Sequence, residues 1–279
     1  MSDLSNALKH KYSVTPGGPF VPGVTTILNI IDKPALKWSA SEIAALAVLN
    51  NTRRKKKIVE EHRAWLLKGR PNEKKATLAR MGSDDEVFVH WARGEFDRQW
   101  RAKAATGTRI HDVAERWTRG ESVEVTKEDA GYVDALEAFH TTYKPRFALV
   151  ECVVLNKALG YGGRFDAIAE LDGPDASGAF NIDYKTGGEY EDSVAMQHIG
   201  YMACELPIYD EKGALISFAE LPPLDGARTV YLKADGTFKV SDPFANIPMA
   251  VAWNGFEACL NLYKATESIK QLLEESADE

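Results

Sequence analysis

The spacing of hydrophobic and polar positions divides the chain into three regions. Residues 12–34 are bounded by prolines and glycines, which predicts an extended lead-in. Between residues 35 and 120, Ala-rich, Leu-rich and charged stretches alternate at helical spacing, which predicts a series of helices. This helical pattern is broken near residues 69–71, 82–83 and 107. Ser83 is expected to cap one helix, because three acidic residues follow it.

From Pro145 onward the pattern changes to short apolar runs typical of strands. A helix at residues 127–143, with Thr126 as its cap, is expected before this change. The elements expected afterwards are strands at 147–155, 161–171 and 179–185, a helix at 191–205, strands at 228–232 and 237–240, and a helix at 248–274. This order predicts an α/β fold with a mixed central sheet flanked by helices. We expect residues 1–105 to form the lead-in and helical region, either as part of the same domain or as a subdomain, and residues 106–279 to form the core with a C-terminal helix.

Composition excludes several classes of protein. The chain is 44% hydrophobic and 27% charged, as soluble globular proteins are, and no apolar run approaches the roughly 20 residues of a membrane span. The N-terminus lacks the basic start and apolar core of a signal peptide. Three widely spaced cysteines give no disulfide framework and are too few for a four-cysteine zinc or iron–sulfur site. We therefore expect a cytoplasmic protein without an iron–sulfur cluster.

A carboxylate and an ammonium share one face of the strand predicted at residues 179–185. Successive side chains of a strand point to opposite faces, so Asp183 and Lys185 lie together, with Asn181 beside them. The apolar residues that point the other way, into the core, are Phe180, Ile182 and Tyr184. An Asp-x-Lys pair of this kind suits a metal-dependent phosphoester hydrolase. A solvated polar strand face has the same appearance.

The preceding strand brings a second carboxylate towards Asp183. The turn between the two strands is centred near Asp175, and Asp166 lies nine residues before this centre while Asp183 lies eight after it. The two carboxylates are therefore expected opposite one another, to within about one residue of register. Converging carboxylates repel unless a divalent cation lies between them. Mg²⁺ or Mn²⁺ suits oxygen ligands, and either ion can activate a water and polarise a phosphate.

A helix that precedes these strands offers further ligands. In Gly107-Thr-Arg-Ile-His111-Asp-Val-Ala-Glu115, the imidazole and the last carboxylate are four residues apart and share one helical face. Such a face can add two ligands to the same cation. From the spacing alone, a buried histidine satisfied by hydrogen bonds and a surface glutamate are the simpler interpretation.

Four short motifs follow one another between residues 107 and 201. They are Gly107-Thr-x-x-His111-x-x-x-Glu115, Gly163-Arg-Phe-Asp166, Ile182-Asp183-Tyr-Lys185-Thr186 and Gln197-x-x-x-Tyr201. In this order they resemble the RecB-like branch of the PD-(D/E)XK nuclease superfamily and its bacteriophage exonucleases. The opening segment Pro22-Gly-Val-Thr-Thr-Ile-Leu also resembles the start of phage members. The joint order of the motifs is more specific than any one of them.

The resemblance implies a restriction-endonuclease-like fold and a role for each matching residue. His111, Asp166 and Asp183 would ligate a metal ion, with the carbonyl of Tyr184 as a candidate fourth ligand, and Lys185 would be the catalytic lysine. The residues with supporting roles would be Glu115, beside the metal ligands, and Gln197 and Tyr201, which would orient the lysine or contact a phosphate. The last two also fit a helix that simply packs on the sheet. Relatives with an iron–sulfur cluster hold it with four cysteines, so this chain resembles the cluster-free phage exonucleases.

The helical region carries an excess of positive charge. The net charge of the chain is −7, yet residues 51–120 contain 18 Lys and Arg against 10 Asp and Glu. The residues expected to bind DNA are Arg53, Arg54, Lys55, Lys56, Lys57 and Arg109, since phosphates respond to local positive charge. A solvated basic helix is the alternative. Three tryptophans of this region could stack on unpaired bases, but we expect them in the core: Trp65, Trp91 and Trp100.

Together these patterns predict a DNA nuclease that depends on Mg²⁺ or Mn²⁺. The resemblance favours an exonuclease acting on single- or double-stranded DNA ends in phage-type recombination or replication. A recombinase or single-strand-binding protein is a candidate partner, and an oligomer is a candidate state. The alternatives are an endonuclease of the same chemistry, a non-catalytic DNA-binding or assembly protein that retains the fold, and a hydrolase of small phosphate esters.

Overall fold

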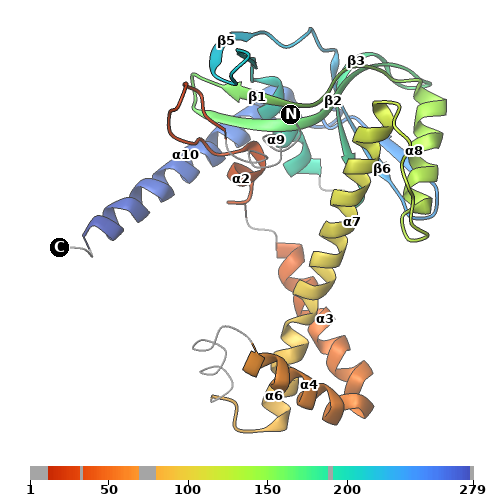
Figure 1. The fold of residues 1–279 in the computed structure, drawn as a ribbon, viewed down its shortest axis with the longest axis vertical. Coiled ribbons are helices and arrows are strands. Elements are labelled where there is room, and N and C mark those ends of the chain that lie inside the picture. The colour runs from red at the N-terminus through yellow and green to blue at the C-terminus, as the bar shows by residue number, and fades with distance from the viewer. Residues whose placement is uncertain (1–11, 32–33, 69–79, 188–190, 277–279) are drawn as a thin grey trace. The chain divides into compact units, whose positions relative to one another are not determined.

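The computed structural model describes residues 12–31, 34–68, 80–187 and 191–276 (Figure 1). The chain forms two compact units: unit 1 comprises Met1–Ile31 and Thr106–Glu279, and unit 2 comprises Asp32–Ala105. The N-terminal region predicted at residues 1–105 is therefore divided, because the described part of the lead-in packs with the core. The helix break predicted near residues 69–71 lies outside the described residues.

Unit 1 is built on a five-stranded mixed sheet (Figure 1). Its strands are β1 (Arg146–Asn156), β2 (Tyr161–Asp172), β3 (Ser177–Lys185), β6 (Gly226–Leu232) and β7 (Phe238–Ser241). They lie in the order β1-β2-β3-β6-β7, and every neighbouring pair is antiparallel except β3 and β6, which are parallel. The predicted α/β class with a mixed sheet is confirmed.

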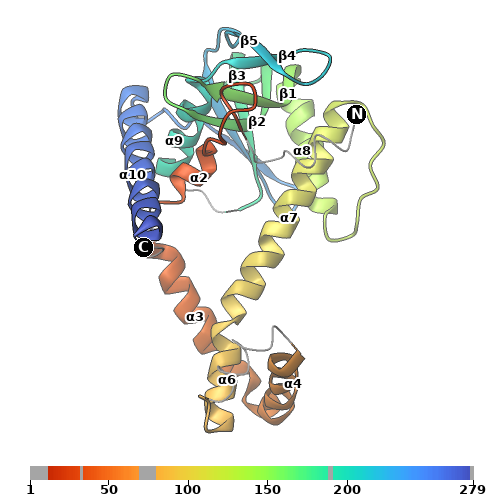
Figure 2. The ribbon, with the colours of Figure 1, turned by 60° about the vertical axis from the view of Figure 1, so that its left-hand side comes forward.

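Helices cover both faces of this sheet (Figure 2). The part of α7 (Glu95–Thr118) that belongs to unit 1 lies with α8 (Ala130–Tyr143) on one face. On the other face lie α2 (Val24–Leu28), α9 (Glu191–Met202) and α10 (Met249–Glu275). Each face has its own hydrophobic cluster, so the sheet is a buried middle layer.

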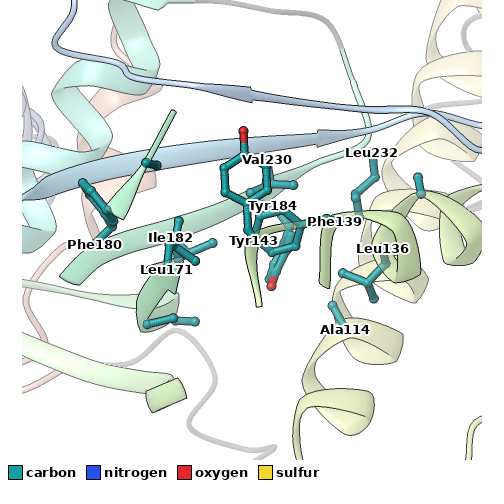
Figure 3. Packing of buried hydrophobic residues seen from close by; sticks show 14 of the residues in the cluster. Ala114, Leu136, Phe139, Tyr143, Leu171, Phe180, Ile182, Tyr184, Val230 and Leu232 are labelled. Carbon is teal, nitrogen blue, oxygen red and sulfur yellow. The ribbon is translucent and has the colours of Figure 1, made fainter. Parts of the chain in front are cut away.

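Phe139 of α8 lies at the centre of the cluster between the sheet and helices α7 and α8 (Figure 3). Its fully buried ring packs against those of Tyr143, Tyr184 and Phe238. Phe180 and Ile182 join Tyr184 in this cluster, as the alternation along β3 predicts. The face of β3 opposite to the polar residues is therefore anchored in the core.

Two predicted helix boundaries are wrong. Helix α7 continues through Gly107, although a break was expected there. A glycine costs a helix only about 1 kcal/mol, and this one faces Thr186, whose Oγ1 would lie 3.4 Å from an added Cβ. Helix α8 begins at Ala130 rather than residue 127, because Thr126 Oγ1 accepts a hydrogen bond from the Asp129 N–H and holds a turn there.

Two further elements differ from the sequence expectation. Residues 24–28, expected to be extended, form the short helix α2, whose apolar side chains pack against the side of the sheet that carries α9 and α10. After α9, the chain forms a small antiparallel pair, β4 (Leu206–Tyr209) and β5 (Leu215–Ala219), which was not predicted. These strands have four and five residues, too few for a clear alternation.

Unit 2 is helical in its described part. It contains α3 (Pro34–Asn51), the 3₁₀ turn η1 (Thr52–Arg54), α4 (Lys55–Lys68), α6 (Asp84–Arg93) and the first part of α7. The predicted cap at Ser83 is confirmed: its Oγ accepts from the Glu86 N–H at 3.2 Å, and Glu86 Oε2 accepts from the Ser83 N–H at 3.0 Å. Helices α4 and α6 share a small hydrophobic cluster. No described helix of the chain is long and apolar enough to cross a membrane.

Candidate metal and active site

The sheet divides at the two predicted carboxylates. The β2–β3 ladder ends with the pair Ala167 and Ile182, so that Asp166 and Asp183 are the next residues beyond its end on β2 and β3. Beyond this point β2 remains paired with β1, and β3 remains paired with β6. The predicted register is confirmed, since the two carboxylates occupy corresponding positions where the strands part. We call this point, where β2 and β3 part, the fork.

Asp166 is held by contacts on both of its oxygens. Its Oδ2 accepts a hydrogen bond of 2.7 Å from the backbone N–H of Tyr184, in place of a strand–strand bond. Its Oδ1 lies 3.3 Å from His111 Nδ1, which α7 brings to the sheet. The predicted convergence of His111 with Asp166 is therefore present. The Tyr184 side chain is buried in the hydrophobic cluster, and its backbone N–H bonds Asp166.

The local charge alters the protonation of this pair. Attraction by Asp166 raises the pKa of His111 to about 9. Burial alone would raise the pKa of Asp166, but His111, Lys185 and the Tyr184 N–H together hold it below its ordinary value. At neutral pH His111 is therefore cationic and Asp166 is anionic. The imidazole is protonated because the carboxylates around it attract positive charge.

Asp183 forms a second set of contacts, with Lys185 and α9. Lys185 Nζ lies 2.7 Å from Asp183 Oδ2 and donates to Gln197 Oε1 at 3.1 Å. Gln197 Nε2 in turn donates to Asp183 Oδ1 at 3.0 Å, and it lies 3.4 Å from the Tyr201 hydroxyl. The four residues form one connected network, in which Gln197 contacts Lys185 directly.

The Asp183–Lys185 pair lies in a shielded place. The Asp183 side chain is 6% exposed and that of Lys185 is 28% exposed. Burial raises the pKa of Asp183 above its ordinary value, although Lys185 opposes this effect. Burial alone would lower the pKa of Lys185, but Asp183 and Asp166 raise it above its ordinary value. Lys185 is therefore a fixed cation at neutral pH.

Gly163 of the second motif has a steric role at this site. A Cβ added there would overlap the ring of Tyr201 on α9. The glycine thus lets α9 approach the sheet closely enough for Gln197 to reach Asp183. A motif glycine is explained here by close approach between a strand and a helix.

Potential metal ligands cluster on the His111 side of Asp166. Within the described part of the chain, the group of three or more ligand atoms all within 4.8 Å of one another is His111, Glu151 and Asp166. Asp183, expected to ligate the same ion, is not in this group, and its carboxylate contacts Lys185 and Gln197. Glu151 was not foreseen from the sequence. A lone carboxylate within the apolar strand at residues 147–155 was the available signal.

Glu115 lies close to this cluster but does not belong to it. It lines the same small recess as His111 and Asp166, and it forms ion pairs with Arg119 at 2.8 Å and Arg164 at 3.6 Å. Arg164 also forms an ion pair with Glu151. Glu115 is thus linked to the potential ligands through an arginine.

The expected DNA-binding residues belong to both units. Arg109 grips the buried carboxylate of Asp129 with two hydrogen bonds of 2.9 and 3.0 Å, at the start of α8. The run Arg53–Lys57 belongs to unit 2, where Lys55 forms an ion pair with Asp85 and Lys57 lies 3.7 Å from Glu61. Arg53, Arg54 and Lys56 are exposed.

The expected burial of the three tryptophans is wrong for two of them. Trp65 is 53% exposed and Trp100 is 45% exposed, whereas Trp91 is partly buried and packs against the cluster of unit 2. One face of Trp65 stacks on His62, and one face of Trp100 stacks on Phe96. A flat ring can cover a neighbouring ring on one side and remain open to solvent on the other.

The chain matches no protein-family model, and no curated protein matches it. What the site can do must therefore be inferred from its own residues. It combines an imidazole–carboxylate cluster suited to a divalent cation with a fixed ammonium on the neighbouring strand. The combination suits chemistry on a phosphate group, which carries negative charge and has an electrophilic centre.

Proposed function

We propose that this chain is a metal-dependent DNA nuclease with a restriction-endonuclease-like core. The observation that carries the proposal is the fork between β2 and β3, where Asp166 and Asp183 occupy corresponding positions on the two strands. His111 approaches Asp166, and Lys185 is fixed beside Asp183. The order of the sequence motifs resembles that of RecB-like nucleases, and the contacts among these residues support the same assignment of roles.

The site residues fit a divalent cation. His111 and Asp166 would hold Mg²⁺ or Mn²⁺, and the motif resemblance adds Asp183 and the Tyr184 carbonyl as ligands. The charge of Asp166, which raises the pKa of His111, would also attract a cation, and His111 would lose its proton when it bound that cation. When bound, such an ion polarises a phosphate and lowers the pKa of a water.

The residues on β3 and α9 would stabilise the negative charge that develops on the phosphate. Asp183 and Gln197 hold Lys185 Nζ at a defined position, so its charge would face the negative charge that develops on the phosphate. Tyr201 supports Gln197 from the same helix. A preorganised ammonium is more effective than a flexible one, since no reorganisation is needed during the reaction.

The experiment that tests the proposal compares two DNA substrates. End-labelled linear DNA and covalently closed circles are incubated with the protein in Mg²⁺, in Mn²⁺ and in EDTA. We expect degradation of the linear DNA with either metal and none in EDTA, with the circles resistant. Cleavage of the circles would assign the endonuclease alternative, and intact substrates in all conditions would overturn the proposal.

Unit 2 would contribute phosphate contacts. Three exposed residues of the basic run are candidates for this: Arg53, Arg54 and Lys56. Changing all three to glutamate is expected to weaken DNA binding and to reduce the slope of log K against log salt by about 3, since each phosphate contact contributes about 0.9. Fluorescence anisotropy at several salt concentrations measures this slope.

The control for this triple variant is a second triple variant in unit 1. It changes to glutamate three exposed lysines: Lys127, Lys212 and Lys233. It produces the same change of net charge at other positions, so it corrects for the global field of the protein. If both variants change the slope equally, the basic run of unit 2 has no special part in DNA binding.

A further inference from the structure

Glu151 of β1 places a third potential ligand atom beside His111 and Asp166. These ligand atoms all lie within 4.8 Å of one another. These three residues line one recess, together with Glu115, Val150 and Tyr184. The sequence predicted no site residue in strand β1.

The backbone presents Glu151 in an unusual way. Its neighbours pair regularly with β2, Val150 with Ala167 and Cys152 with Phe165, so Glu151 stands opposite Asp166. Its φ is +52°, in the left-handed region that residues other than glycine rarely adopt. The carboxylate is 13% exposed. The fold thus holds a shielded carboxylate beside Asp166 through a conformation that a glycine would adopt more readily.

Arg164 contacts one oxygen of the Glu151 carboxylate. Its Nε forms an ion pair with Glu151 Oε2, and its Nη2 lies 3.6 Å from Glu115 Oε1. A carboxylate has two oxygens, so an arginine on Oε2 leaves Oε1 able to bind a cation. Residues that contact a metal ligand without touching the metal orient that ligand and tune its affinity for the ion.

We propose that Glu151 is a protein ligand of the catalytic cation, together with His111 and Asp166, and that Arg164 positions it. The inference rests on the proposed function for the presence of a cation, and it moves the ion towards β1. Asp183 then serves mainly to fix Lys185, which is where its contacts already lie. One imidazole and two carboxylates form a set that suits Mn²⁺ as well as Mg²⁺.

Binding of Mn²⁺ to the full chain, measured by calorimetric titration without DNA, tests this inference. We expect Glu151→Gln to weaken Mn²⁺ binding at least tenfold, and Asp183→Asn to weaken it less. The control is Glu170→Gln, which removes a carboxylate that pairs with Arg146 across the same two strands, at an exposed position. This control should bind Mn²⁺ as the unaltered protein does.

A second variant guards against loss of the fold. Glu151→Gly removes the carboxylate and suits the positive φ, which offsets part of the loss of the ion pair with Arg164, so the metal-free protein should remain folded. We expect Mn²⁺ to raise the melting temperature of the unaltered protein but to raise that of Glu151→Gly much less. Equal Mn²⁺ stabilisation of both proteins would overturn the role of Glu151.

The two proposals can fail separately. If the unaltered protein cleaves DNA and binds Mn²⁺, but Glu151→Gln binds it equally well, Glu151 is not a ligand and the nuclease proposal stands. If Asp183→Asn weakens binding more than Glu151→Gln does, the ion lies at the fork instead. If Mn²⁺ binding depends on Glu151 but DNA remains intact, the ligand assignment stands and the nuclease proposal is overturned.

Discussion

Replacing Lys185 with alanine is expected to lower the rate of DNA cleavage roughly a hundredfold to a thousandfold, as loss of one preorganised charge or donor does in other enzymes. The protein should remain folded. Gln197 still donates to Asp183 in this variant, and burial already raises the pKa of that carboxyl, so it can take up a proton instead of remaining an unpaired charge. Single-turnover cleavage of end-labelled DNA measures the rate.

Two further measurements make this result specific. Lys212→Ala removes the same charge from an exposed turn and should cleave at the ordinary rate. Binding of DNA in EDTA should differ little between Lys185→Ala and the unaltered protein, because the loss concerns the reaction and not the encounter. Ordinary cleavage by the Lys185 variant would remove this residue from the chemistry.

Replacing Phe139 with alanine is expected to destabilise unit 1 by about 3–5 kcal/mol, the usual cost of deleting a buried phenyl ring. The ring is fully buried and supports Tyr143, Tyr184 and Phe238. Since Tyr184 belongs to β3, the loss should also lower cleavage at temperatures where the unaltered protein is active. Urea unfolding followed by far-UV circular dichroism, with the transitions of the two units fitted separately, measures the effect.

Phe139→Leu is the matched control, because it retains most of the side-chain volume. Its cost should be below about 1.5 kcal/mol, as for other substitutions that nearly conserve volume. Similar losses for the alanine and leucine variants would mean that the aromatic contacts, and not the filled volume, stabilise this cluster.

The central part of the site follows directly from local sequence. Alternation along β3 places Asp183 and Lys185 on one face and Ile182 and Tyr184 in the core, and the structure agrees. The hairpin turn sets the register that brings Asp166 to the corresponding position. Such patterns are readable because strand geometry has a fixed period of two and turns are short.

Other features depend on distant contacts and have no local signal. Helix α7 runs through Gly107, which lies against Thr186, far along the chain. Arg109 was expected to bind DNA, yet its guanidinium holds Asp129, twenty residues further along the chain. Glu151 reaches Asp166 through a backbone conformation that no sequence pattern indicates. Each of these outcomes is decided by the tertiary structure.

The bond between the Asp166 carboxylate and the Tyr184 amide has an evolutionary consequence. This aspartate closes the end of a strand pair, so selection for a stable protein would retain it even after enzymatic activity had disappeared. The Lys185 ammonium instead contacts the side chains of Asp183 and Gln197. In a descendant that had lost its activity, the lysine would disappear first, and a surviving aspartate would say little about whether the enzyme still works.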